Sequence, residues 1–155
     1  MIIKYLKHSE IDKCKWDECI AKSNNGLIYS TSVYLDNMTT EWDGLVMGNY
    51  EAVMPLPFRK KYGIYYVYPP AFSQQMGITS VKEITPEIIK TFLKNIPTKF
   101  RYVEMNFNVS NIYTFSNEKE RNNYFLPLYS SFENSFDSPV FKFLYTNMDS
   151  YFAGS

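Results

Sequence analysis

The sequence predicts an α+β fold in which a mostly antiparallel sheet is flanked by helices, and three observations indicate it. Between Trp42 and Tyr68 the chain reads as consecutive strands separated by short turn signals. Residues 9–23 and 85–96 instead place apolar side chains at helical spacing. A further alternating segment follows at 100–107. Strands grouped in this way, with helices before and after them, are typical of α+β folds.

The first part of the chain is predicted to form a strand and two helices. Residues 2–6 alternate enough to form an opening strand. Ser9 is predicted to cap a helix that runs toward Ser23. Residues 24–26, Asn-Asn-Gly, supply a turn, and we expect 28–36 to be extended at first and then to form a short helix.

A meander of three strands is predicted next. Residues 42–47 and 50–58 flank Gly48-Asn49, a two-residue link that favours a tight antiparallel hairpin. A second turn is predicted at 59–63, and a third strand at 64–68.

Two prolines restrict the place of the second strand in the sheet. Pro55 and Pro57 have no backbone N–H to donate, and being two residues apart they point the same way. We therefore expect them at a sheet edge, a bulge or a strand end rather than in a central ladder.

A helix and a strand complete the predicted layer. Residues 85–87, Thr-Pro-Glu, carry a capping hydroxyl, a proline at the first helical position and an acid near the helix N-terminus. The apolar stripe that follows should pack on the sheet until Pro97 ends the helix. In the strand at 100–107 the odd-numbered residues are mostly apolar and are predicted to face the core, leaving Glu104 and Asn106 on the other face.

Charge and hydropathy argue against several classes of partner. The 16 basic and 16 acidic side chains cancel, and no long block of like charge predicts a nucleic-acid patch or a polybasic membrane anchor. No apolar run approaches the ~20 residues of a bilayer crossing. The first residues do not form a secretory signal, so a cytoplasmic location and no membrane partner are the default expectations.

The cysteines and the single histidine also limit the chemistry. Cys14 and Cys19 are five residues apart on the first predicted helix, about 140° around its axis, so two reduced thiols are expected rather than a disulfide. His8 is the only histidine, which argues against a His-rich metal centre and leaves one formal Ser-His-Asp arrangement open. No metal site is predicted.

The chain contains, in order, the segments SVYLD at 32–36, WDGLV at 42–46, AVMPLP at 52–57, YPP at 68–70 and QQMGI at 74–78. Taken in this order, they resemble the first half of the FemABX-like proteins, which are built from two copies of the GNAT acyltransferase fold. The resemblance covers about residues 1–128 and implies a GNAT-like unit there, with 123–128 as its last strand and 129–155 as an irregular tail or a short strand or helix.

The resemblance implies an acyltransferase-related protein that moves an acyl or aminoacyl group to an amine. In the family a second GNAT unit follows and carries the groove for the acyl donor, an acyl-CoA or an aminoacyl-tRNA. Only residues 129–155 follow the unit here, so no cofactor is expected in this chain itself unless the family activity is retained. A homo-oligomer such as a dimer, or a separate second unit, would have to supply the missing half.

Five residues are candidates for this chemistry. Glu104 is the candidate general base and Asn106 the candidate positioning amide, because an attacking amine must lose a proton. The alternative is that both residues belong to an exposed polar face of the sheet. Tyr68, Gln74 and Gln75 are the candidate substrate-binding residues. The two glutamines precede a glycine as in a phosphate-binding loop, but the second glycine is missing, and their amides would also suit backbone groups of a long loop.

Two other functional classes remain open. A non-catalytic GNAT-like binding or interaction module, shortened or degenerate, would fit the 14 tyrosines and 12 phenylalanines, some of which must stay partly exposed. A carbohydrate-binding module rests on aromatic content alone, which core packing also explains. The basic run at 59–61 could attract a phosphate-bearing substrate or form a solvated turn.

Overall fold

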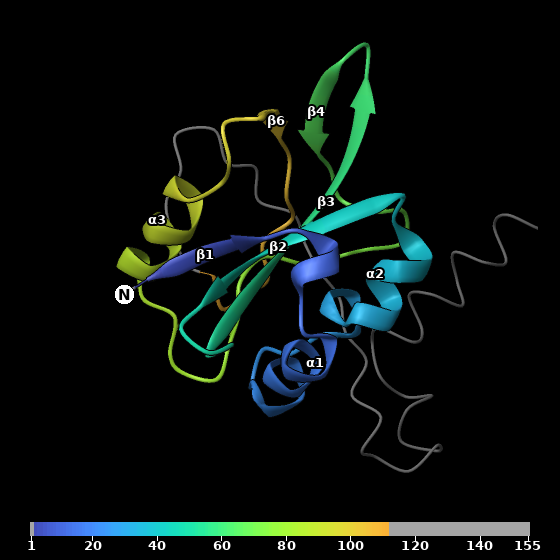
Figure 1. The fold of residues 1–155 in the computed structure, drawn as a ribbon. Coiled ribbons are helices and arrows are strands. Elements are labelled where there is room, and N and C mark those ends of the chain that lie inside the picture. Colours follow the sequence, from blue (N-terminus) through green and yellow to red (C-terminus); the bar gives the residue numbers. More distant parts are fainter. Residues whose placement is uncertain (1, 112–155) are drawn as a thin grey trace, which may run out of the picture. The chain divides into compact units, whose positions relative to one another are not determined.

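A computed structural model describes residues 2–111 of the chain, and these residues define the fold (Figure 1). They form a six-stranded sheet and three α-helices, which confirms the predicted α+β class. The strands are β1 Ile3–Leu6, β2 Glu41–Met47, β3 Ala52–Lys61, β4 Ile64–Val67, β5 Thr79–Ser80 and β6 Phe100–Val103. The helices are α1 Lys13–Lys22, α2 Ser32–Met38 and α3 Pro86–Lys94, with 3-10 turns at His8–Glu10 and Ile28–Ser30.

The sheet is mixed but mostly antiparallel. Its described strands follow the order β1-β2-β3-β4-β6, and β5 pairs with the start of β3, on the same side of β3 as β4. Within the described part of the chain, β4 and β6 are the one pair of strands that run parallel. A parallel pair needs a crossover connection, which here contains α3.

Helices cover both faces of the sheet. Alternate residues of each strand point to opposite faces and so pack against different helices. In Figure 1, α3 lies on one side and α1 and α2 on the other. The apolar stripe of α3 packs against the even-numbered side chains of β3, as predicted, through Ile88, Ile89 and Phe92. The opposite core is centred on Trp16 of α1 and includes Leu35, Val46 and Val53.

The caps of the helices correct one prediction and confirm another. Asp12, not Ser9, caps α1, and its carboxylate accepts a hydrogen bond from the N–H of Lys15 at 3.2 Å. Ser9 lies in the 3-10 turn that precedes the helix. Thr85 caps α3 and Pro86 occupies its first turn, as predicted from the sequence.

Both hairpin turns differ from the prediction in length or position. Met47 pairs with Ala52, so the first loop has four residues, 48–51, rather than the two expected. The second strand continues through Lys61, so the basic run is part of β3 and the turn is Tyr62-Gly63. Both turn residues have positive φ, 51° and 80°, as tight two-residue hairpin turns require.

The prolines are accommodated in a central strand by a gap in the pairing. β5 pairs with the first two residues of β3 and β4 with its last four, so on that side residues 54–57 have no partner among the described strands. Pro57 faces this gap, since its carbonyl accepts a hydrogen bond from the N–H of Tyr68 at 3.1 Å. Pro55 points the same way. The expectation of a sheet edge therefore holds locally, although β3 lies inside the sheet.

The last described strand is shorter than predicted, and its expected buried face is wrong. β6 ends at Val103, and after buried Phe100 the residues through Glu104 are exposed. The alternation fails because β6 is the outermost described strand and neither of its faces is buried after Phe100. The predicted strand at 123–128 and the segment 129–155 lie outside the described residues.

Candidate functional site

The carboxyl ends of β4 and β6 lie side by side and bring two predicted site residues together. Val67 and Val103 are in register at the ends of the strands. Tyr68 follows the first, Glu104 follows the second, and the Glu104 N–H donates to the Val67 carbonyl at 3.1 Å. In open sheets, ligands bind beyond the carboxyl ends of parallel strands. We call Tyr68, Glu104 and the segments that adjoin them the β4–β6 end.

The loop after Tyr68 returns to the same place. The Met76 N–H donates to the Asn106 carbonyl at 2.6 Å, and the Met76 carbonyl accepts from the Asn108 N–H at 3.0 Å. Gln75 is half-buried next to this pairing, whereas Gln74 is exposed. The backbone therefore brings the predicted substrate-binding loop next to Asn106.

Tyr68 has a hydroxyl group with unused hydrogen-bonding capacity. Its oxygen is buried and has no hydrogen-bond partner within residues 2–111. The Arg59 guanidinium carbon lies 4.5 Å from the centre of the Tyr68 ring, and the Tyr66 ring is 6.0 Å away. Buried hydroxyls normally have a partner, so this oxygen is an exception within residues 2–111.

The candidate base and its amide are accessible to different degrees. The Glu104 side chain is exposed, and its Oε2 accepts a hydrogen bond from the Tyr102 hydroxyl at 3.4 Å. Asn106 is half-buried. Both lie beyond the end of β6 rather than on its outward face, so the structure does not place them in one strand as predicted.

Asparagines, not the glutamines, hold the returning loop. Asn111 is buried; its Oδ1 accepts from the Ile78 N–H at 2.7 Å and its Nδ2 donates to the Ile78 carbonyl at 3.0 Å. Asn25 donates to the same carbonyl at 2.9 Å and accepts from the Ser80 N–H at 3.2 Å. The sequence prediction gave this role to Gln74 and Gln75, and no sequence signal singled out the asparagines.

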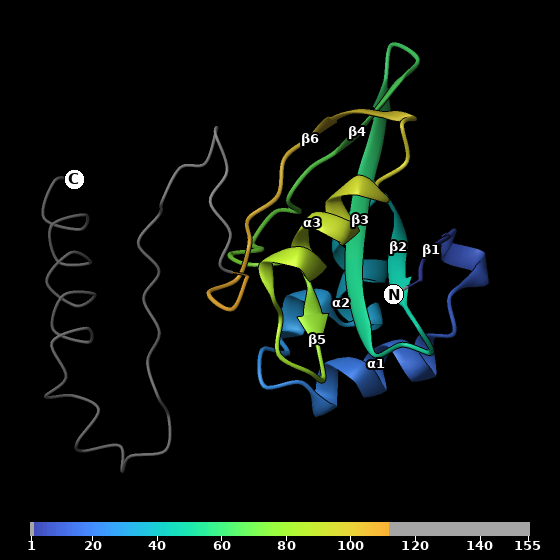
Figure 2. The ribbon, with the colours of Figure 1, turned by 90° about the vertical axis from the view of Figure 1, so that its left-hand side faces the viewer.

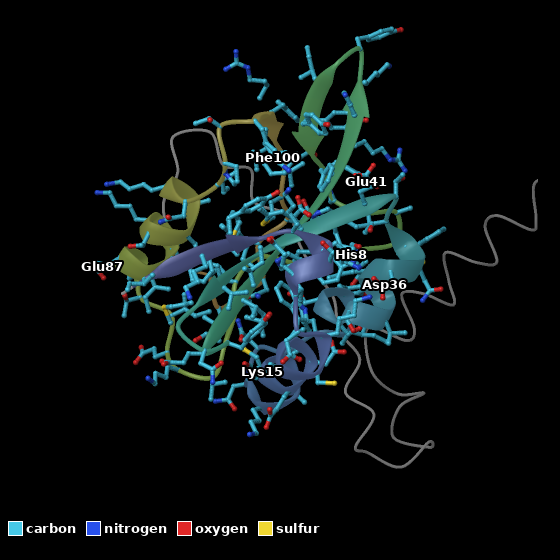
Figure 3. All side chains as sticks on the ribbon, in the orientation of Figure 1. His8, Lys15, Asp36, Glu41, Glu87 and Phe100 are labelled. Atoms are coloured by element: carbon cyan, nitrogen blue, oxygen red, sulfur yellow. The ribbon has the colours of Figure 1, made fainter. Side chains whose placement is uncertain are left out.

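A second polar cluster, which sequence reasoning missed, surrounds Asp36 (Figure 3). Asp36 accepts from Lys13 Nζ at 2.7 Å and from Trp42 Nε1 at 3.0 Å, and His8 Nε2 lies 2.9 Å from it. Burial opposes ionisation of Asp36, but the hydrogen bonds from Lys13, Trp42 and His8 outweigh it and lower the pKa of its carboxyl. The cluster borders a hollow of about 190 Å³ lined by His8, Asp36, Thr39, Thr40, Glu41, Trp42, Asp43 and Phe58.

A third set of contacts joins β1, β2 and the start of β6 through buried Asp43. Its carboxylate accepts hydrogen bonds from the Tyr5 hydroxyl and the His8 N–H, and it pairs with Lys99 Nζ at 3.0 Å. Burial and the hydrogen bond to Asp43 raise the pKa of Tyr5. These partners are 35 to 56 residues apart in the sequence, so local patterns could not reveal them.

The hollow does not complete a nucleophilic triad with His8. Among the residues that line it, only Thr39 and Thr40 carry an aliphatic hydroxyl, and none is a cysteine or serine. His8 is held by Asp36 and packs against Trp42, with ring centres 5.1 Å apart. We therefore interpret this cluster as a structural link between the start of β2 and the helices.

The described residues also bear on metal binding, membrane crossing and cysteine pairing. In residues 2–111, no group of three or more His, Cys, Asp or Glu side chains could hold a metal ion. No helix of this part of the chain is long and apolar enough to cross a bilayer. Cys14 is exposed, Cys19 is buried, and both are unpaired thiols, as predicted.

Comparison with known proteins identified no relative. No family model, no curated protein and no solved structure matches this chain. The choice among functions therefore depends on the residues and geometry described above.

Proposed function

We propose that this chain is a GNAT-like acyltransferase-related protein whose reaction takes place at the β4–β6 end. The observation that carries the proposal is the parallel pairing of β4 with β6, after which Tyr68 and Glu104 follow the ends of the two adjacent strands. The mixed sheet and the helices on both faces are compatible with a GNAT-like unit. The resemblance of residues 1–128 to the FemABX-like first half suggests the class of reaction.

In this proposal Glu104 acts as the general base. The amine nitrogen of the acceptor attacks the carbonyl carbon of an acyl thioester or ester; the new C–N bond forms, the C–S or C–O bond breaks, and the proton lost by the amine passes to the Glu104 carboxylate. The buried Tyr68 hydroxyl and the Asn106 and Gln75 amides orient the substrates. The acyl donor is held between two copies of the chain, or between this chain and a separate second GNAT unit.

The test is acetyl transfer from acetyl-CoA to a panel of primary amines. The free CoA that the reaction releases is measured by chromatography. Glu104→Gln should lower the rate about 10²–10⁴-fold, because it removes the proton acceptor while keeping the size of the side chain. Glu83→Gln is the matched control, since Glu83 is also exposed but lies outside the β4–β6 end. Equal rates for wild type and Glu104→Gln, or no acetyl-CoA binding by calorimetry at millimolar concentration, would contradict the proposal.

One observation favours a second candidate, a non-catalytic interaction module. Tyr62 closes the β3–β4 hairpin and is 92% exposed, and Tyr102 of β6, the neighbour of β4, is 59% exposed. Exposed aromatic side chains are typical of interaction surfaces. Such a module would bind a partner or a second copy without turnover. Light scattering over a range of concentrations, combined with absence of CoA binding, would identify it.

A further inference from the structure

The β3–β4 hairpin extends beyond the rest of the described sheet (Figure 1, Figure 2). The first residue of β2, Glu41, pairs with Phe58, so β3 from Arg59 onward has no described partner on the β2 side. On the other side, β6 pairs with β4 only from Tyr65 onward. The end of the hairpin is therefore a two-stranded ribbon that closes at Tyr62-Gly63, with no further described strand beside residues 61–64.

The side chains of this ribbon are ordered by type along its length. At its tip, Tyr62 is 92% and Ile64 is 52% exposed. Behind the tip come three consecutive exposed cations, Arg59, Lys60 and Lys61. Strand residues rise about 3.3 Å each, so the apolar tip and all three cations fit within about 10 Å.

The ribbon is positively charged although the chain is neutral overall. No Asp or Glu occurs between residues 58 and 68, whereas the whole chain has 16 acidic side chains to 16 basic ones. Exposed Arg101 of β6 adds a fourth cation beside β4. By charge complementarity, the ribbon is therefore suited to an anionic partner.

The order of the side chains favours a lipid surface over a single-stranded nucleic acid. Peripheral elements bury apolar side chains about 5–10 Å into the lipid interface, tyrosines settle at headgroup level, and cations meet the phosphates. Nucleic-acid bases instead stack on open ring faces. Here Lys61 Nζ and Lys60 Nζ lie 5.5 Å and 5.0 Å from the ring centres of Tyr62 and Tyr65, and a cation covers a face of each ring.

We propose that the β3–β4 hairpin docks on anionic lipid bilayers. Tyr62 and Ile64 enter the interface, and Arg59, Lys60, Lys61 and Arg101 contact headgroup phosphates. The expectation of no membrane partner rested on the lack of a spanning segment and of a long basic block, and peripheral docking needs neither. The docking does not depend on acyl transfer, so either proposal can fail alone.

The test is co-sedimentation of the full chain with vesicles of phosphatidylcholine alone or with about one third phosphatidylglycerol. We expect binding to the anionic vesicles that weakens with added salt and is nearly absent on neutral ones. Lys60→Gln with Lys61→Gln should weaken binding about 25-fold, from about 5-fold for each charge removed. Tyr62→Ser with Ile64→Ser should weaken it about 10-fold without changing the salt dependence.

A charge-matched control separates the hairpin from net charge. Lys90→Gln with Lys94→Gln removes two exposed cations from α3 and should leave binding within about 2-fold of wild type. Circular dichroism of every variant verifies folding. The proposal is overturned if the control loses as much affinity as the hairpin variants, or if neutral vesicles bind equally. Hairpin-dependent binding of an oligo-dT probe without vesicle binding would assign the surface to nucleic acid and also overturn it.

Discussion

Replacing Asn111 by alanine should destabilise the loop that forms one wall of the β4–β6 end. Asn111 is 6% exposed, and its side chain makes two hydrogen bonds to the main chain of Ile78, at 2.7 and 3.0 Å. The Ile78 carbonyl keeps donors from Asn25 and Asn108 at 2.9 and 3.3 Å after the change. The Ile78 N–H, in contrast, loses the acceptor that Asn111 provides.

The magnitude follows from these two bonds. Each net hydrogen bond contributes about 1 kcal/mol, and a buried N–H left without an acceptor costs about 1–3 kcal/mol. We therefore expect Asn111→Ala to lower the free energy of unfolding by about 2–4 kcal/mol. Asn111→Asp retains an acceptor for the N–H but turns a carboxylate oxygen toward the Ile78 carbonyl, so it should also destabilise the fold.

Urea unfolding followed by fluorescence measures the effect, because Trp16 and Trp42 are both buried. With a slope of about 2 kcal/mol per molar urea, the midpoint should fall by about 1–2 M. Asn37→Ala is the control, since its amide donates to the Val33 carbonyl at an exposed site on α2. A loss below about 0.5 kcal/mol for Asn111→Ala, the range of ordinary surface changes, would refute this role for the Asn111 amide.

Three further predictions concern backbone strain and pH. Gly77→Ala should destabilise the fold by at least about 2 kcal/mol in the same urea assay, because Gly77 has a positive φ of 91° and an added Cβ would lie 2.2 Å from Asn111 Oδ1. An unchanged free energy of unfolding would contradict this close approach of Gly77 to Asn111. The pKa of Tyr5 is raised in the folded state, so its contribution to stability is complete below about pH 10 and is lost as the pH rises further. Tyr5→Phe should therefore flatten the alkaline limb of a curve of unfolding free energy against pH. An unchanged alkaline limb would contradict the raised pKa. The pKa of Asp36 is lowered on folding, so its contribution to stability is present above about pH 3.9 and disappears as the pH falls below that value. Asp36→Asn should therefore flatten the acid limb of the same curve. An equally steep acid limb would argue against the Lys13 and His8 contacts.

The fold was predictable where neighbouring residues carry the signal. The Thr85-Pro86 start of α3 and its apolar stripe are local features, and both are as predicted. Ser9 was mistaken for the α1 cap because Asp12, three residues later, is equally suited and is the residue whose carboxylate reaches a free helix N–H. The hairpin turn moved to Tyr62-Gly63 because β4 pairs with Arg59–Lys61, a choice that turn propensity alone does not determine.

The candidate site was predictable only in part. Tyr68 and Glu104 were named from the sequence, but their adjacency results from a parallel pairing between segments separated by a helix. Asn111 and Asp43 were missed because their partners are distant in the chain, and a single asparagine or aspartate in a sequence does not reveal whether it will be buried. Asp43 is buried, and its partners Tyr5, which donates a hydrogen bond to it, and Lys99, which forms an ion pair with it, both come from other parts of the chain.

The central claim is that ligand binds at the β4–β6 end, and amide chemical shifts during a titration with acetyl-CoA test it most directly. We predict that the largest saturable shifts occur at Tyr68, Gln75, Glu104 and Asn106. Shifts confined to the hollow beside His8 and Asp36, or none at millimolar acetyl-CoA, would contradict it.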